Sequence, residues 1–337
     1  MSKLLDTVLL QALPASGKSE VRKYLDGLTP EQCREDFHMG PTVQLDDYPY
    51  VHLMHRIDDE LKMRGQSYVF FKGPNRSFID NFEWGTLIHL LNEDYADLLS
   101  GKVVEVPSAG QWMMDRLDDA HAKVELPKAL GEVPYRIRRE VGEAIEKECR
   151  KELDYRNKIC REGTEGKTIF IEAARGGPHG AAFPLRPPHG YQYSFGQFSS
   201  QILSRSCVLY IWVTPEESRR KNIERAKPDG QGSILHHTVP MEVMLGEYGC
   251  DDLDYLTSVS EKKDTICIER PELMTNEQGE KVYKFARWFL PVAKFDNRGD
   301  LTSFIRQRKN RADWLPSEVN AIHTELKRAL DHVWKAQ

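Results

Sequence analysis

The sequence predicts an α/β fold of the three-layer sandwich type, in which helices cover both faces of a mostly parallel sheet that carries a large helical insertion. Two observations predict it. Short apolar runs of the kind that form buried strands alternate with helical segments, and that alternation is typical of parallel sheets. In addition, about 120 residues between the second and third of these runs show helical periodicity and little strand signal.

Residues 1–50 predict a strand, a loop, a helix and a second strand. Residues 6–11 (DTVLLQ) are a short apolar run expected to form a buried strand. Residues 12–19 (ALPASGKS) form a turn of small residues, and residues 20–25 begin a helix that Pro30 should keep short. Residues 41–45 (PTVQL) are the second strand. Together they predict a βαβ unit with a right-handed crossover.

Three further strands complete the predicted sheet. They are expected at 167–171, at 207–213 and within 289–295. The clearest helices are expected at 51–64, 82–99, 134–158, 216–227, 301–308 and 317–334. This order divides the chain into an α/β core, residues 1–50 and 165–337, and a helical insertion, residues 51–164.

The composition excludes several classes of protein. Of the 337 residues, 40% are hydrophobic and 29% are charged, a balance that supports a buried core. The formal net charge is -5, so the basic excess of a duplex-DNA binder is missing and no stable nucleic-acid partner is expected.

Targeting and redox signals predict a cytoplasmic protein. No apolar run reaches the ~18 residues that a membrane helix needs, so no membrane partner is expected. Residues 1–11 are too short a stretch for a signal peptide. The six cysteines are scattered and include no C-x-x-C pair, which is typical of thiols in a reducing compartment.

Residues 12–19 match the Walker A pattern of phosphate-binding loops, with Ala12 in place of the first glycine. In such loops, successive backbone N–H groups and the positive end of the next helix face phosphate oxygens. Gly17 permits the required backbone, Lys18 would reach the β- and γ-phosphates, and the Ser19 hydroxyl would ligate Mg²⁺. A buried strand before the motif and a helix after it argue against a chance match. The candidate nucleotide-binding residues here are Ala12, Pro14, Ala15, Ser16, Gly17, Lys18 and Ser19.

Acidic residues follow two predicted strands at the edge where α/β sheets bind ligands. Asp46 and Asp47 come after the second strand, and Glu172 comes after the third. These carboxylates could serve Mg²⁺, and one could take a proton from an acceptor hydroxyl. Asp46 or Asp47 could instead begin the next helix, and Glu172 could form a structural ion pair. The candidate metal ligands are Ser19, Asp46 and Glu172.

Four segments together, ALPASGKS, QLDDYPY, IFIEAARGG and YIWVTPEESRRKNIERA, resemble P-loop small-molecule kinases. The chain is most similar to the uridine kinase, phosphoribulokinase and pantothenate kinase branch. That branch has an Asp-Asp-Phe-Tyr-like segment after strand two, where Asp46-Asp47-Tyr48 stands here. It has a Val-Glu-Gly-like segment after strand three, where Glu172 is followed by Ala173 in place of the glycine.

The resemblance covers the sheet core and implies a P-loop NTPase-type fold. It implies transfer of the γ-phosphoryl group of ATP, with Mg²⁺, to a small metabolite, with nucleosides and nucleotides as the leading acceptors. Asp46 or Asp47 would be the base for the acceptor hydroxyl, with Asp46 the first choice because it directly follows the strand. Glu172 would help to hold Mg²⁺ or the acceptor. The insertion, residues 51–164, would bind the acceptor.

In kinases of this type, the helix after strand four leads into a lid whose arginines close over the phosphates. This implies catalytic roles for Arg220 and Arg225. These arginines could instead be paired with glutamates on a solvated helix face. The loop after strand five often packs on adenine in such kinases, which makes Asn297 a candidate nucleotide contact.

The alternative is a P-loop ATPase with a regulatory or switching role and no small-molecule acceptor. A GTPase normally has an Asn-Lys-x-Asp motif, and the nearest segment, which begins at Asn157, lacks the aspartate. The chain also has no signature loop of the ABC type. These absences favour a kinase.

Overall fold

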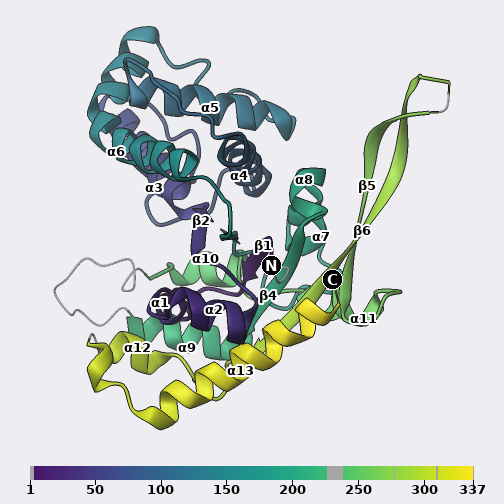
Figure 1. The fold of residues 1–337 in the computed structure, drawn as a ribbon. Helices are drawn as coiled ribbons and strands as arrows, with labels where there is room; N and C mark the ends of the chain where they lie inside the picture. Colours follow the sequence, from purple (N-terminus) through teal and green to yellow (C-terminus); the bar gives the residue numbers. More distant parts are fainter. Residues whose placement is uncertain (1–3, 226–237, 277, 309, 337) are drawn as a thin grey trace.

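The computed structural model describes residues 4–225, 238–276, 278–308 and 310–336 (Figure 1). Its sheet has six strands in the order β2-β3-β1-β4-β6-β5. The strands are β1 (Thr7–Gln11), β2 (Thr42–Asp46), β3 (Thr168–Glu172), β4 (Ser206–Trp212), β5 (Thr265–Thr275) and β6 (Lys281–Asp296). Neighbours pair in parallel, except that β5 and β6 are antiparallel. The predicted α/β fold with a mostly parallel sheet is therefore confirmed.

The side chains of β1 explain how the sheet is covered on both faces, because successive residues of a strand point to opposite sides. Val8 and Leu10 belong to a cluster with helices of one face, and Leu9 belongs to a cluster with helices of the other. The first face is covered by α1 (Lys18–Asp26), α2 (Pro30–Phe37), α12 (Ser303–Gln307) and α13 (Pro316–Lys335). The second is covered by α4 (Glu83–Ser100), α7 (Gly190–Gly196), α8 (Ser200–Leu203) and α11 (Leu253–Val259).

The helices α2, α7, α8 and α11 and the strand β5 of the core were not predicted. Pro30 follows the end of α1 but also starts α2, a helix that was not predicted. Thr29 caps α2 by accepting a hydrogen bond from the Gln32 N–H at 3.2 Å, and proline is well tolerated in a first helical turn. Strand β5 was also missed, because Pro271 and charged residues interrupt its apolar pattern.

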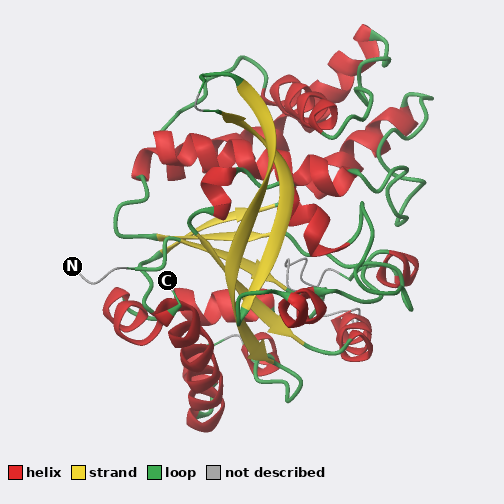
Figure 2. Ribbon diagram, turned by 90° about the vertical axis from the view of Figure 1, so that its right-hand side faces the viewer, coloured by secondary structure: helices red, strands yellow, loops and turns green. Residues whose placement is uncertain are grey.

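Strands β5 and β6 extend beyond the sheet as a two-stranded arm (Figures 1 and 2). The distal part of β6 is exposed, which is why only residues 289–295 carried the signal of a buried strand. Tyr283 and Phe285 on this arm are 75% and 78% exposed.

Four helices lie between β2 and β3: α3 (Tyr48–Met63), α4, α5 (Ala109–Lys123) and α6 (Tyr135–Glu162). Three of them were predicted, and α5 was not. They share a hydrophobic cluster that also includes Met244, just after the start of α10 (Met241–Gly246). Asp94 links α4 to its neighbours through Arg116 at 2.7 Å and Arg156 at 2.9 Å. The helices therefore pack on one another as well as on the sheet.

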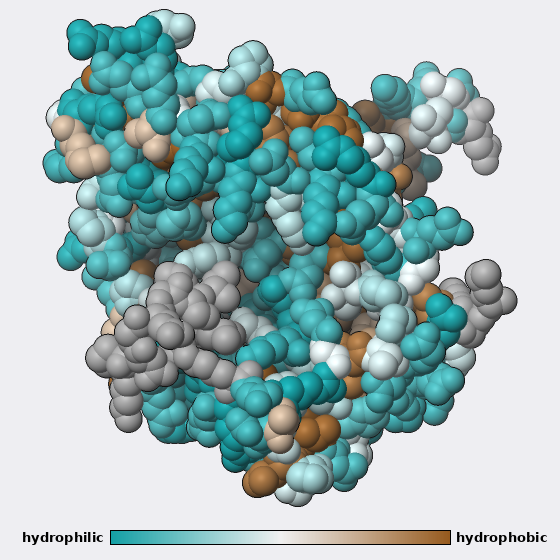
Figure 3. Space-filling view, turned by 60° about the vertical axis from the view of Figure 1, so that its left-hand side comes forward, coloured by the Kyte–Doolittle hydropathy of each residue, from teal (hydrophilic) through white to brown (hydrophobic). Residues whose placement is uncertain are grey.

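The remaining elements are α9 (Pro215–Arg225) and a short 3₁₀ helix (Arg311–Asp313). Helix α9 corresponds to the helix predicted at 216–227, whose last two residues lie outside the described residues. None of the helices in the described residues combines the length and the apolar character needed to span a membrane. The face drawn in Figure 3 is largely hydrophilic. All six cysteines are free thiols.

Candidate active site

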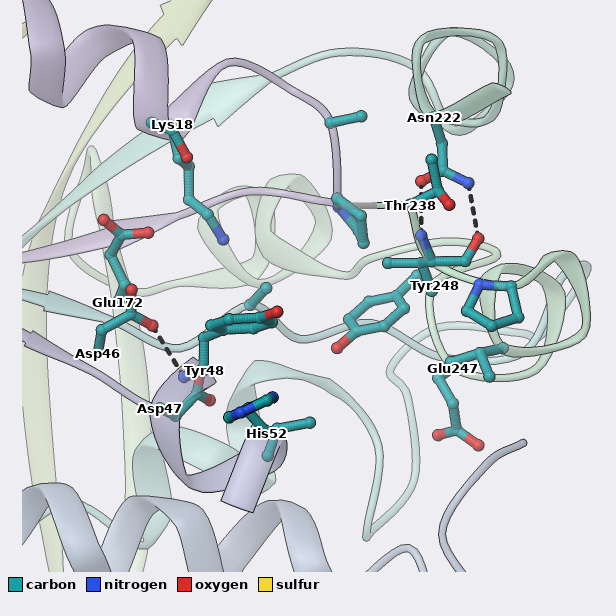
Figure 4. A pocket seen from close by; sticks show the side chains of 18 of the residues that line it. Lys18, Asp46, Asp47, Tyr48, His52, Glu172, Asn222, Thr238, Glu247 and Tyr248 are labelled. Carbon is teal, nitrogen blue, oxygen red and sulfur yellow. Dashed lines mark hydrogen bonds between the residues drawn. The ribbon is translucent and has the colours of Figure 1, made fainter. Parts of the chain in front are cut away.

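A cavity of about 560 Å³ lies at the carboxyl ends of β1, β2 and β3. One end is formed by the 12–19 loop and the start of α1, and the other by α3, the 71–78 loop and residues 238–248. Figure 4 shows side chains from both ends facing the same space. The predicted residues that line the cavity are Pro14, Ala15, Lys18, Ser19, Asp46, Asp47, Glu172 and Arg225.

The 12–19 loop has a tightly constrained backbone. Gly17 has φ +109°, and a Cβ there would lie 2.6 Å from Thr302 Oγ1 and 2.7 Å from Asn297 Nδ2. Ala15 also has a positive φ, of 60°. Ser218 of α9 donates a hydrogen bond to the Pro14 carbonyl at 2.7 Å. Helix α1 begins directly after Gly17, so its free N–H groups point toward the cavity end of the loop.

The Asn297 side chain supports this loop from behind and does not line the cavity. Its side chain is fully buried, and Nδ2 donates to the Ser16 carbonyl at 2.7 Å and to Thr302 Oγ1 at 2.9 Å. Its Oδ1 accepts from the Leu301 N–H at 2.8 Å. With both ends of the amide in use, the side chain positions the loop. Ala12 is likewise buried and does not line the cavity, and Ser16 is buried with its hydroxyl unpartnered among the described residues.

Replacing Gly17 with alanine should destabilise the protein by about 1–3 kcal/mol, because the substitution combines a positive φ with a clash against Asn297 and Thr302. Urea unfolding measures this loss. Gly65→Ala is the matched control, since Gly65 has φ +74° but nothing within 4 Å of a new Cβ. Equal losses in the two variants would show that the loop has room for the methyl group.

Lys18 presents its ammonium group to the cavity (Figure 4). The group forms no hydrogen bond or ion pair with any residue in the described part of the chain. Burial lowers the pKa of Lys18, and the nearby Glu172, Asp47 and Asp46 carboxylates oppose that shift. A desolvated cation at a helix N-terminus, with no direct partner among the described residues, has the chemistry that suits an anion.

Asp46 and Glu172 lie side by side because they occupy paired positions of the parallel strands β2 and β3. Arg22 of α1 contacts Glu172 Oε1, and its Nη1 lies 3.4 Å from Asp46 Oδ2. The Tyr48 N–H donates to Asp46 Oδ1 at 2.9 Å. Burial raises the pKa of both carboxyl groups, with the charge of Asp47 adding to the rise at Asp46 and the charge of Asp46 adding to the rise at Glu172, while Arg22 and Lys18 oppose these rises.

Asp47 has a different environment from Asp46. Its Oδ2 accepts from Arg175 Nη1 at 2.7 Å, and the Arg175 side chain is only 2% exposed. Arg175 also donates to the Trp84 carbonyl at 3.1 Å and lies over the Trp84 ring at 4.8 Å. The Asp47–Arg175 pair therefore joins the end of β2 to the start of α4.

Of the two predicted arginines, only Arg225 lines the cavity. It pairs with Glu20 at 3.2 Å, and Arg306 pairs with the same carboxylate at 3.2 Å. Arg220 lies outside the cavity, because its side chain is 51% exposed and is held on the helix surface by Glu217 and Glu224. Arg220 is therefore paired with glutamates on a solvated helix face, which was the alternative interpretation of its sequence pattern.

Aromatic and histidine side chains line much of the cavity wall, beginning with Tyr48 close to Lys18 (Figure 4). They are Tyr48, His52, His55, Phe71, Phe78, Trp84 and Tyr248. The His55 and Phe71 rings are stacked, with centroids 3.6 Å apart. The Trp84 indole N–H donates to Glu247 at 3.1 Å, and Asn81 donates to the same buried carboxylate at 3.0 Å. These contacts fix the orientation of Trp84 at the wall.

Sequence reasoning missed several of these residues. Arg22 could have been found, because it lies one helical turn after Lys18 and therefore faces the same strand ends. No local signal marks Tyr248, which reaches the cavity from a segment about 200 residues beyond Asp47.

Within the described residues, no group of three or more His, Cys, Asp or Glu side chains could hold a metal ion. The cavity instead offers the Ser19 hydroxyl and the Asp46 and Glu172 carboxylates, which are oxygen ligands suited to Mg²⁺. Mg²⁺ in proteins often uses one or two carboxylates together with waters and phosphate oxygens, so this small donor set fits the ion when phosphates are present.

None of the family models, curated proteins or solved structures compared with this chain matches it.

Proposed function

We propose that this chain is an ATP- and Mg²⁺-dependent phosphotransferase that acts on a small metabolite, with nucleosides and nucleotides as the leading acceptor class. The observation that carries the proposal is the Lys18 ammonium, which has no partner within the described part of the chain and lies beside the Asp46–Glu172 pair. The cavity that holds these groups also has an aromatic end. Cation and carboxylates at the phosphate end supply charge for phosphoryl transfer.

The 12–19 loop would bind the phosphates of ATP, as in a P-loop NTPase-type fold. Its backbone N–H groups and the start of α1 would face the phosphate oxygens, and Lys18 would neutralise the β- and γ-phosphates. Ser19, Asp46 and Glu172 would hold Mg²⁺, which when bound neutralises charge on the transferring group. Arg225 at the cavity edge would add positive charge if it left Glu20 for the phosphates.

Asp46 is the better candidate for the base that takes the proton of the acceptor hydroxyl. Asp47 is committed to the buried Arg175, whereas Asp46 lines the cavity, accepts a hydrogen bond from the Tyr48 N–H at 2.9 Å and lies 3.4 Å from Arg22. Burial raises the pKa of Asp46 and makes it a stronger proton acceptor than an exposed aspartate.

The aromatic end would bind the acceptor. Tyr48, Trp84 and Tyr248 offer ring surfaces on which a planar base can pack. Tyr48 and Tyr248 extend into the same space from different elements (Figure 4). This lining supports a ring-bearing acceptor over an aliphatic one. It also favours a kinase over an ATPase without an acceptor, which would not need this second end.

The experiment is to measure ADP formation from Mg·ATP alone and with pools of nucleosides, nucleoside monophosphates, sugars and vitamin precursors. Lys18→Ala serves as the blank. We expect a ring-bearing pool to raise ADP formation well above the level without acceptor, and splitting that pool identifies the acceptor. ADP formation that no pool changes would replace this proposal with a regulatory ATPase.

A further inference from the structure

Arg22 lies against both Asp46 and Glu172, the two carboxylates proposed to hold Mg²⁺. It follows Lys18 by one turn of α1, so both cations face the ends of β2 and β3. Its guanidinium contacts Glu172 and lies 3.4 Å from Asp46. These two residues are paired on adjacent strands, whose backbones lie ~4.8 Å apart. Arg22 therefore bridges the two predicted metal ligands.

The charges around these carboxylates balance without a metal. With all four groups ionised, the two negative charges of Asp46 and Glu172 are matched by the two positive charges of Lys18 and Arg22. The neighbouring Asp47 is already matched by Arg175. A free divalent cation would leave excess positive charge in a desolvated place, which is costly. Nucleotide phosphates would bring the missing negative charge with them.

Two observations indicate that Arg22 can leave Asp46 and Glu172. Arg22 Nε is buried and has no hydrogen-bond partner among the described residues, so the guanidinium is incompletely held. Asp26 lies one turn further along α1, lines the same cavity and attracts Arg22 electrostatically. Arg22 thus has another carboxylate, Asp26, to turn to when it leaves Asp46 and Glu172.

We propose that Arg22 is an internal counter-ion that occupies the Asp46–Glu172 pair until a metal–nucleotide complex arrives, so that the site excludes free divalent cations. The inference rests on the proposed function, because it takes Asp46 and Glu172 as metal ligands. Arg22 is a positioning residue in this account. Its removal should make cation binding independent of nucleotide.

The test is a titration with Mn²⁺ in the absence of nucleotide, followed by electron paramagnetic resonance of free Mn²⁺. Arg22→Met should bind Mn²⁺ about tenfold more tightly than wild type, because the carboxylates lose their nearest cation. Arg22→Lys should remain close to wild type. Adding Glu172→Gln to Arg22→Met should abolish the gain. Arg22→Gln replaces Arg22→Met if the latter does not fold.

Lys23→Met is the matched control, since it removes the same charge from the neighbouring position. Lys23 lines the cavity, but its ammonium contacts the Ile305 carbonyl at 3.5 Å and not the two carboxylates. An equal gain in Lys23→Met, or no gain in Arg22→Met or Arg22→Gln, would overturn the inference. Wild type should bind Mn²⁺ together with a non-hydrolysable ATP analogue. Failure of that binding would count against the proposed function, whereas its success without a gain on removing Arg22 would reject only the role of Arg22.

Discussion

Lys18→Ala is expected to lower the rate of phosphoryl transfer by about 10²–10³-fold or more while leaving the folded protein at least as stable as wild type. The loss of rate follows from removing the cation that would neutralise the transferring phosphate. The preserved stability follows from the surroundings of Lys18, which has no ion-pair partner among the described residues. Single-turnover ADP formation measures the first effect, and urea unfolding at pH 7 measures the second.

The pH dependence of that stability has a defined sign. Burial lowers the pKa of Lys18 in the folded state, so the unfolded chain binds this proton more tightly. The charged Lys18 therefore lowers the free energy of unfolding of wild type by its full amount at pH values below its pKa in the folded protein. This destabilisation fades as the pH rises toward the pKa of lysine in the unfolded chain, ~10.4. Any gain in stability from Lys18→Ala should shrink over the same range.

Lys23→Ala, on the same helix, is the control and should leave transfer nearly unchanged. Retained turnover in Lys18→Ala would reject the phosphate-loop assignment. A marked loss of stability at pH 7 would instead show that the Lys18 ammonium is paired in the folded protein.

The same substitution should reduce activity at Asp46 and stability at the adjacent Asp47. Asp46→Asn should slow transfer by about 10²–10⁴-fold, because it removes the proton acceptor, while ATP binds with nearly unchanged affinity. Asp47→Asn should destabilise the protein by about 3 kcal/mol, because it leaves the buried Arg175 without its counter-charge. Rapid-quench rates, nucleotide titration and urea unfolding on both variants separate the effects.

Each variant serves as the control for the other, since both remove one negative charge from the end of β2. If Asp46→Asn weakened ATP binding as much as it slowed transfer, Asp46 would lose the role of base. If Asp47→Asn were fully stable and inactive, the two assignments would be exchanged.

The sequence was most informative where local pattern and structure depend on the same few residues. Strand β1 is five buried residues followed directly by a loop of small residues, so the positions of the strand and of the 12–19 loop could both be predicted. Asp46 and Glu172 were placed together because parallel strands bring their carboxyl ends to one edge.

The sequence was least informative where a contact depends on residues that are far apart in the chain. The loop after β6 was expected at the nucleotide, but its Asn297 amide faces the Ser16 carbonyl, a residue 281 positions earlier. Arg175 follows β3 directly, yet only the packed structure shows that it neutralises Asp47. Strand β5 depends on pairing with β6 and not on burial, so its exposed half has no apolar signal.

The strand order also governs when the protein can fold during its synthesis. Strand β1 hydrogen-bonds to β3 and β4, beginning with the pairs Thr7–Ile169 and Thr7–Ser206, so its partners are translated long after it. At ~5–20 residues per second, about 160 residues of intervening chain take roughly ten to thirty seconds to emerge from the ribosome. During that time the apolar β1 segment has no partner in the sheet. The inserted helices, which pack largely on one another, can form first and bring β2 to β3. The 12–19 loop is therefore encoded near the start of the chain but can be completed only late in synthesis.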